Sequence, residues 1–268
     1  MLEIQIDEKR YPDRGGRAHV ALADLHLEVA RGEFVCVVGP SGCGKSTLLN
    51  LVGGLDRDVR GRVALDGRPP EDIGFMFQEP RLMPWLSVLE NVLLVAAEPR
   101  LARERAAGLL RAMELGEVLG AFPGRLSGGM QRRVALARAF VNEPALLLMD
   151  EPFVSLDAPT AERLRAMLVD MWQRSGATVL FVTHDLREAL ALADRVCFMS
   201  ASPGRVMLDL PVSLARPRSV LDPAVVNLQA DLLARYPALL AGLAGGADDD
   251  GADEAGGPGQ GAMEALHG

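Results

Sequence analysis

The sequence predicts an α/β fold in which helices cover a mostly parallel β-sheet and a helical lobe is inserted. Short continuous apolar runs, typical of buried strands, recur at residues 34–38, 145–149, 178–183 and 196–199. Segments with helical periodicity lie between several of these runs. The stretch 79–143 has no strand pattern and is rich in Ala, Leu, Arg and Glu. It therefore predicts a separate helical lobe.

The remaining elements follow in order from periodicity. Alternation of apolar and polar residues predicts strands over 2–7 and about 20–29, and glycines and a short helix over 46–52 follow the strand at 34–38. Inside the lobe, helical patterns cover 88–120 and 134–141. The other expected elements are strands over 62–67, 73–77 and 205–210, helices over 161–174 and 186–193, and a turn at 202–204.

The chain divides into a body, residues 1–243, and an acidic Gly/Ala/Asp-rich tail, residues 244–268, that we expect to be disordered. The tail carries six Asp or Glu residues and no Lys or Arg, so most of the formal net charge of −8 belongs to it. An acidic balance argues against a broad nucleic-acid-binding face, which needs a basic surplus. No nucleic acid partner is expected.

The sequence also argues against a membrane-spanning or secreted protein. No apolar run approaches the about 18–20 residues that cross a bilayer. The alternating start Met1–Asp7 lacks the pattern of a signal peptide. The three cysteines form no CxxC pair, which fits a reducing compartment better than a disulfide framework or a zinc site.

The strongest motif is a phosphate-binding loop, residues 39–46, with the pattern GxxxxGK[ST]. It lies between a buried strand and a helix, as the motif requires. Its glycines allow backbone N–H groups to surround phosphates, and the helix N-terminus adds a positive dipole end. Lys45 supplies a charge for the β- and γ-phosphates, and the Ser46 hydroxyl is a ligand for Mg²⁺. Cys43 lies inside the loop, so we expect that alkylating it blocks nucleotide binding.

Two acidic residues, Asp150 and Glu151, follow the apolar run 145–149 directly. Ligand sites of open α/β sheets gather at such strand ends. Asp150 is expected to hold Mg²⁺ through water, and Glu151 to orient and polarise an attacking water.

A third segment, Leu126–Met130, places a Ser-Gly-Gly turn at the start of a basic helix. This signature turn is a second helix N-terminus suited to phosphate. One chain seldom points two such ends at one nucleotide, whereas two chains paired head to tail can do so.

With these motifs the sequence resembles the ATP-binding-cassette family over about residues 2–215. The phosphate loop, Gln78 of the Q-loop, the signature turn, the Walker B acids Asp150 and Glu151, the D-loop Ser155–Asp157 and the switch residue His184 occur in family order. The resemblance implies a P-loop ATPase core with a mostly parallel sheet, an antiparallel β subdomain and an inserted α-helical subdomain. Met130 departs from the family pattern, which has Gln there, and we expect activity to survive this.

The resemblance also implies the roles of individual residues in a dimer that holds two ATP molecules. Glu151, His184 and Gln78 would be catalytic, and Ser46, Gln78 and Asp150 would hold Mg²⁺. Tyr11 looks like the aromatic residue that stacks on adenine, although its loop, through Arg17, is longer than usual. The nucleotide would be bound by Tyr11, Gly39, Ser41, Gly42, Cys43, Gly44, Lys45, Ser46 and Thr47, and across the dimer by Ser127, Gly128, Gly129 and Asp157.

Two segments, Phe77–Val92 and Ser200–Val206, are similar to those of importers of nitrate, sulfonates and taurine. This implies an ATPase subunit on the cytoplasmic face of the bacterial inner membrane. Its partners would be a second cassette, a polytopic permease and an external solute-binding protein. Leu82, Met83 and Trp85 would form an exposed apolar patch for the permease.

Two alternatives remain at this point. One is a soluble cassette ATPase of DNA repair or translation, although the chain has one cassette and no sustained heptads. The other is a P-loop kinase for a small molecule, which would leave the signature turn and His184 unexplained.

Overall fold

Two β-sheets form the centre of the molecule, and the computed structural model describes residues 1–12 and 18–243 of the chain. A six-stranded sheet has the order β5-β6-β7-β3-β8-β9, parallel except for β9. An antiparallel sheet has the order β2-β1-β4. The bounds of the strands are β1 Leu2–Pro12, β2 Ala18–Val29, β3 Phe34–Val38, β4 Arg60–Leu65, β5 Ile73–Met76, β6 Leu146–Asp150, β7 Thr178–Thr183, β8 Arg195–Met199 and β9 Val206–Pro211.

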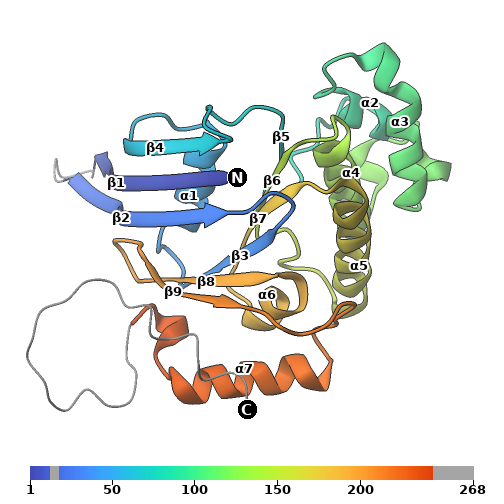
Figure 1. The fold of residues 1–268 in the computed structure, drawn as a ribbon. Helices are drawn as coiled ribbons and strands as arrows, with labels where there is room; N and C mark the ends of the chain where they lie inside the picture. Colours follow the sequence, from blue (N-terminus) through green and yellow to red (C-terminus); the bar gives the residue numbers. More distant parts are fainter. Residues whose placement is uncertain (13–17, 244–268) are drawn as a thin grey trace, which may run out of the picture.

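Alternation along the strands divides the core in two. In β3, Val35 and Val37 join one cluster with side chains of β1, β2 and α1 (Lys45–Val52), whereas Phe34, Cys36 and Val38 join a second cluster with the helices on the other face. α1 therefore lies between the two sheets (Figure 1). Burial on both faces explains why the central strands are continuously apolar.

The expected helical lobe is present and lies to one side of the sheets (Figure 1). Its last helix begins at Gly128, earlier than periodicity alone indicated, because the Ser127 hydroxyl accepts a hydrogen bond from the Met130 N–H (3.2 Å) and caps it. The lobe comprises α2 Val88–Leu93, α3 Pro99–Ala112, the 3₁₀ turns Gly116–Val118 and Pro123–Arg125, and α4 Gly128–Phe140.

The C-terminal part of the described chain wraps around the body. The helices α5 (Ala158–Ser175) and α6 (Leu186–Leu192) are followed by α7 (Pro223–Arg235), which packs on α6. The sequence analysis did not predict α7. A last 3₁₀ turn, Leu239–Ala241, leads to Gly242, whose carbonyl accepts a hydrogen bond from the Ala201 N–H (3.0 Å). The tail expected to be disordered, residues 244–268, lies outside the described residues.

No helix among the described residues is long and apolar enough to cross a bilayer.

Gly74 of β5 shows how closely the lobe approaches the sheet. A Cβ atom there would lie 2.2 Å from the Ala139 carbonyl oxygen on α4 and 2.7 Å from Leu147 Cδ2. We predict that Gly74→Ala lowers the free energy of unfolding by about 1–3 kcal/mol through overpacking, measured by urea denaturation. Gly108→Ala is the control, because Gly108 is exposed in α3 with open space around it. That control should gain about 0.5–1 kcal/mol. Equal effects of the two changes would contradict the prediction.

Candidate functional site

The phosphate loop is held between the two sheets by close backbone contacts. It connects β3 to α1, and Gly42 (φ 78°) and Gly44 (φ 103°) have left-handed backbones that favour glycine. A Cβ atom on Gly44 would lie 2.5 Å from Leu22 Cδ2 of β2, so no larger residue fits. The loop therefore presents its backbone in one fixed arrangement.

The side chains of Ser41, Lys45, Ser46 and Thr47 face a cavity of about 390 Å³. We call this the nucleotide cavity. Its walls come from four regions of the sequence: the end of the β1–β2 hairpin, the phosphate loop, Gln78, and the acids after β6. The other lining residues are Tyr11, His19, Ala21, Gly42, Gly44, Gln78, Asp150 and Glu151.

Lys45 is buried and oriented by the loop itself. Its Nζ donates hydrogen bonds to the carbonyl oxygens of Gly39 (2.8 Å) and Pro40 (3.1 Å) and lies 3.9 Å from Glu151 Oε1. The other carboxylate oxygen of Glu151 lies 3.0 Å from Nδ1 of His184. The structure thus brings a cation, a carboxylate and an imidazole into one chain of contacts.

Glu151 and His184 differ in exposure: the Glu151 side chain is 19% exposed and that of His184 is 55%. Glu151 has a left-handed backbone (φ 41°), and its N–H donates a hydrogen bond to the Val182 carbonyl oxygen (3.0 Å) at the end of β7. This backbone bond fixes the carboxylate at the edge of the sheet.

Asp150 and Ser46 provide oxygen ligands next to each other. Burial raises the pKa of Asp150, while a hydrogen bond with the Ser46 hydroxyl and the charge of Lys45 oppose that rise. A partly buried carboxylate beside a hydroxyl is a donor set that suits a hard cation such as Mg²⁺. The described residues contain no cluster of three His, Cys, Asp or Glu side chains that could hold a metal ion unaided. Mg²⁺ usually takes only one or two carboxylates and completes its shell with phosphate and water, so the residues fit that ion.

Tyr11 also lines the nucleotide cavity. It is half-buried, and its hydroxyl donates a hydrogen bond to Asp56 Oδ2 (2.9 Å). Burial and this carboxylate raise the pKa of Tyr11. The Lys9 ammonium lies 4.6 Å from the centre of the Tyr11 ring. The ring position is therefore fixed. The remainder of the long loop that follows, residues 13–17, lies outside the described part of the chain.

Several expected site residues do not face the nucleotide cavity. The Ser127 hydroxyl caps α4, and the Asp157 carboxylate caps α5 by accepting a hydrogen bond from the Thr160 N–H (3.0 Å). Gly128 and Gly129 are likewise absent from the cavity lining. One chain therefore does not bring the signature turn to its own phosphate loop.

Cys43 also points away from the nucleotide cavity. Its side chain is buried, with Sγ 4.0 Å from Lys45 Nζ, and burial raises the pKa of the thiol. A thiol with a raised pKa and no exposure reacts slowly, so alkylation of the native protein is a weaker test of the site than the sequence suggested.

Two buried arginines on α4 were missed as site residues in the sequence analysis. Nη1 of Arg132 donates to the carbonyl oxygens of Gln78 (2.8 Å) and Pro152 (2.6 Å), and Nη2 donates to that of Val154 (2.7 Å). Arg138 donates to the carbonyl oxygens of Pro80 and Arg81 (2.6 and 3.0 Å). These bonds tie the segment after β5 and the segment after β6 to the lobe. Their only sequence signal is a charged residue on an otherwise apolar helix face.

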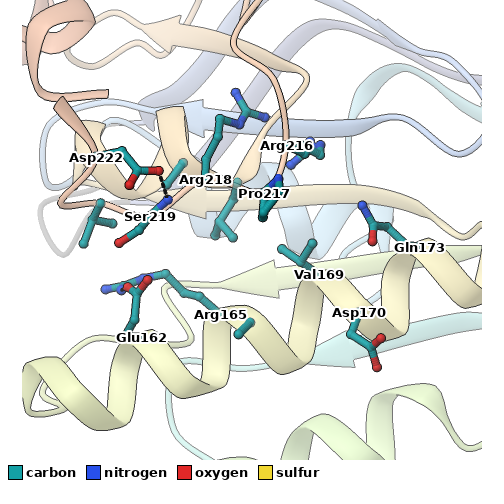
Figure 2. A pocket seen from close by; sticks show the side chains of 14 residues that line it. Glu162, Arg165, Val169, Asp170, Gln173, Arg216, Pro217, Arg218, Ser219 and Asp222 are labelled. Atoms are coloured by element: carbon teal, nitrogen blue, oxygen red, sulfur yellow. Dashed lines mark hydrogen bonds and ion pairs between the residues drawn. The ribbon is translucent and has the colours of Figure 1, made fainter. Parts of the chain in front are cut away.

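A second cavity, of about 460 Å³, lies between α5 and residues 216–222 (Figure 2). Two of its guanidinium groups are engaged in ion pairs: Arg165 pairs with Glu162 (2.7 Å) and Arg216 with Asp194 (2.6 Å). Nε and Nη1 of Arg218 have no hydrogen-bond partner among the described residues, but they are inaccessible to solvent. A ligand in this cavity would not reach them, so it lacks the features of a phosphate site.

Comparison with known proteins agrees with this geometry. Residues 22–154 match the family model described as ABC transporter. The chain is 49% identical over 245 residues to aliphatic sulfonates import ATP-binding protein SsuB 2 of Burkholderia lata, covering 89% of this chain and 87% of that protein. It is 41% identical over 241 residues to SsuB of Bacillus licheniformis, covering 88% and 94%.

Among solved structures, the chain is similar to an ATP-binding cassette described as dimeric, in a post-hydrolysis state and bound to ADP and Pi. The TM-score is 0.70 and the sequence identity 34%, over 80% of this chain and 100% of that chain.

Arg132 generates a prediction about the site. Arg132→Met should leave three carbonyl oxygens without their donor and lower the free energy of unfolding by about 2–3 kcal/mol, measured by urea denaturation. It should also reduce ATP turnover because Gln78 loses its support. Arg103→Met, at an exposed position on α3, is the control and should change stability by no more than about 0.5 kcal/mol. A fully stable Arg132→Met protein would argue against this role.

Proposed function

The chain belongs to the ABC transporter family of ATP-binding cassettes, and on that premise we propose that it powers a bacterial importer of a sulfonate or a related small organic anion. It is an ATP-hydrolysing cassette, as its family membership establishes. The importer and the class of cargo are inferred from its relatives, which are named as aliphatic sulfonate import proteins.

The observation that carries the proposal is the lining of the nucleotide cavity. A single 390 Å³ space is lined by an aromatic ring, the phosphate loop, Gln78 and two acids. These groups suit the parts of a nucleoside triphosphate, with Tyr11 for the base and Lys45 for the phosphates. Asp150 and Glu151 lie where the terminal phosphate would meet metal and water.

The chemistry is phosphoryl transfer to water, for which the chain supplies positioning and charge. Lys45 neutralises charge on the β- and γ-phosphates. Glu151 would orient the attacking water, and His184, 3.0 Å from Glu151 Oε2, would hold the carboxylate and contact the γ-phosphate. Ser46, Asp150 and Gln78 would hold Mg²⁺, which neutralises phosphate charge when bound.

The signature turn completes the site from a second copy of the chain. Ser127, Gly128 and Gly129 stand at the N-terminus of α4, away from the nucleotide cavity of their own chain. A helix N-terminus binds phosphate through free N–H groups and its positive dipole end. Two cassettes facing head to tail would each close the other's site, with Asp157 near the shared interface. ATP then favours the closed dimer because the γ-phosphate is bound from both sides.

The permease contact is proposed for the exposed apolar side chains of the helical lobe. Trp85 is 70% exposed, and Leu94, Val95 and Leu101 are also exposed. Leu82 and Met83, expected in this patch, are partly buried, and Leu82 packs on the core. A cavity of about 330 Å³ lined by Phe77, Arg81 and Val95 adjoins the patch and fits a cytoplasmic segment of a membrane protein.

Under this proposal the chain works at the cytoplasmic face of the membrane, on a permease that would receive its cargo from an external solute-binding protein. ATP binding would close the cassette dimer and move the lobes with the attached permease, and hydrolysis would reset them. Arg132 and Arg138 tie Gln78 and its neighbours to α4, so closure at the phosphates is transmitted to the lobe.

Glu151→Gln separates hydrolysis from binding. The amide still fills the site but is a poor base, so turnover should fall by at least about 100-fold while ATP affinity is retained. The ATP-bound protein should then persist as a dimer in size-exclusion chromatography. Adding Ser127→Arg should abolish that dimer without weakening ATP binding to the monomer, because Ser127 acts across the interface.

Glu71→Gln is the matched control, because Glu71 is exposed and outside the nucleotide cavity. It should leave turnover and oligomeric state unchanged. A Glu151→Gln protein that binds ATP yet stays monomeric at high concentration would contradict the proposed mechanism. A dimer insensitive to Ser127→Arg would contradict the assignment of the signature turn.

The importer itself is tested in native cells. The tagged chain, isolated from membranes in mild detergent, should carry a polytopic membrane protein at about one copy per cassette. Trp85→Asp should reduce that recovery while leaving ATP turnover of the isolated chain intact. Deletion of the gene should impair growth on an alkanesulfonate as sulfur source and not on sulfate. Recovery only from the soluble fraction, with growth unaffected, would overturn the transport proposal and leave the ATPase chemistry standing.

A further inference from the structure

The register of the β1–β2 hairpin places a histidine beside the expected adenine-stacking residue. Tyr11 of β1 pairs directly with His19 of β2. Directly opposed residues of an antiparallel pair project from the same face, with Cβ atoms about 4.5–5.5 Å apart. Both side chains line the nucleotide cavity. Two rings therefore line this cavity, of which sequence resemblance accounted for one.

His19 is held by a turn that is distant in the sequence. Its Nε2 lies 3.2 Å from Oγ of Ser202, and the same Oγ donates a hydrogen bond to the Val20 carbonyl oxygen (3.2 Å). A hydroxyl carries one proton, and a carbonyl oxygen accepts only. With that proton directed to Val20, the contact with His19 requires Nε2–H as the donor.

This arrangement leaves Nδ1 of the neutral imidazole as an acceptor. No described residue donates a hydrogen bond to it. Tyr11 offers no comparable group, because its hydroxyl is already bonded to Asp56. Among the two rings, the imidazole supplies the free hydrogen-bonding atom.

We propose that His19 is a second recognition residue for the nucleoside part of ATP, accepting at Nδ1 a hydrogen bond from a nucleoside donor while Tyr11 stacks on the base. Two groups carry suitable donors: the exocyclic amine of adenine and the ribose hydroxyls. Ser202 is a positioning residue, since it selects the tautomer that leaves Nδ1 free. The inference rests on the proposed function, because it assumes that the nucleotide occupies this cavity.

The test is the dissociation constant of ADP, measured by isothermal titration calorimetry at about pH 8. His19→Ala should weaken ADP binding about fivefold, the effect of one hydrogen bond. His19→Phe, which keeps an aromatic ring and loses the acceptor, should weaken it equally. His26→Ala is the matched control, because His26 is an exposed histidine on the same strand and outside the cavity, and it should have no effect.

Two analogues identify the donor. If the exocyclic amine is the donor, IDP should bind wild-type and His19→Ala proteins equally. If the ribose 2′-hydroxyl is the donor, 2′-deoxy-ADP should do so. If wild type binds one of these analogues no more tightly than His19→Ala does, the proposal is supported, and the group that this analogue lacks is the donor. A His19→Ala affinity within error of wild type, or a His19→Phe affinity equal to wild type, would overturn it.

Ser202→Ala tests the positioning role through the tautomer of His19, which a general loss of stability would not change. The ¹⁵N chemical shifts of His19 should report the Nε2–H tautomer in the wild type and a mixture in the variant. ADP affinity should fall about twofold to threefold in Ser202→Ala, and the double variant with His19→Ala should bind ADP no more weakly than His19→Ala alone. Additive losses would contradict the positioning role.

Failure of this inference is distinguishable from failure of the proposed function. A wild-type protein that binds neither ADP nor ATP would refute the nucleotide site as a whole. A wild-type protein that binds ADP, with His19 variants that bind it equally well, would refute only the role of His19.

Discussion

The close backbone approach of the phosphate loop to β2 and to the turn at 200–204 is the constraint on which the rest of the structure depends. Gly44 has no room for a Cβ atom against Leu22, and a Cβ atom on Gly204 would lie 2.1 Å from the Cys43 carbonyl oxygen. These contacts join the antiparallel sheet to the parallel one around α1. The same contacts direct Lys45 toward Glu151 and bring the hairpin end to the mouth of the cavity.

The described chain carries two separate parts of a reaction site, the phosphate loop and the signature turn. Its phosphate loop faces a cavity that lacks the signature turn, and its signature turn caps α4 at a distance from that cavity. Under the proposed function, each part is completed only by another copy of the chain, so hydrolysis takes place only after two cassettes have closed. Arg132, which bonds to the carbonyl oxygens of Gln78, Pro152 and Val154, links the closing surface to the lobe that would carry the permease.

Local pattern was enough to predict the central strands and the phosphate loop, because burial on both faces demands continuous apolar runs and tight loops demand glycine. Contacts between residues distant in the sequence could not be predicted from local pattern. Nothing in the sequence near Arg132 indicates the three carbonyl oxygens to which it donates hydrogen bonds, and nothing near α7 indicates that it packs on α6. Helical periodicity alone begins at residue 134, whereas the Ser-Gly-Gly turn indicated the earlier start of α4, which the Ser127 hydroxyl caps. Leu82 and Met83 were expected to be exposed by analogy and are partly buried. The predictions of a long loop through Arg17 and of a disordered tail concern residues 13–17 and 244–268, which lie outside the described structure.

Gly242, near the end of the described chain, lies close to the phosphate loop. Its carbonyl is bonded to Ala201, and a Cβ atom on it would lie 3.0 Å from Pro40 of the phosphate loop. The described chain therefore ends one residue after a close contact with the phosphate loop. A purification tag, a fluorescent protein or a surface-attachment linker spliced in at residue 244 would start there. The amino terminus, bonded to Asp66 on the antiparallel sheet, is the point of attachment that avoids the phosphate loop.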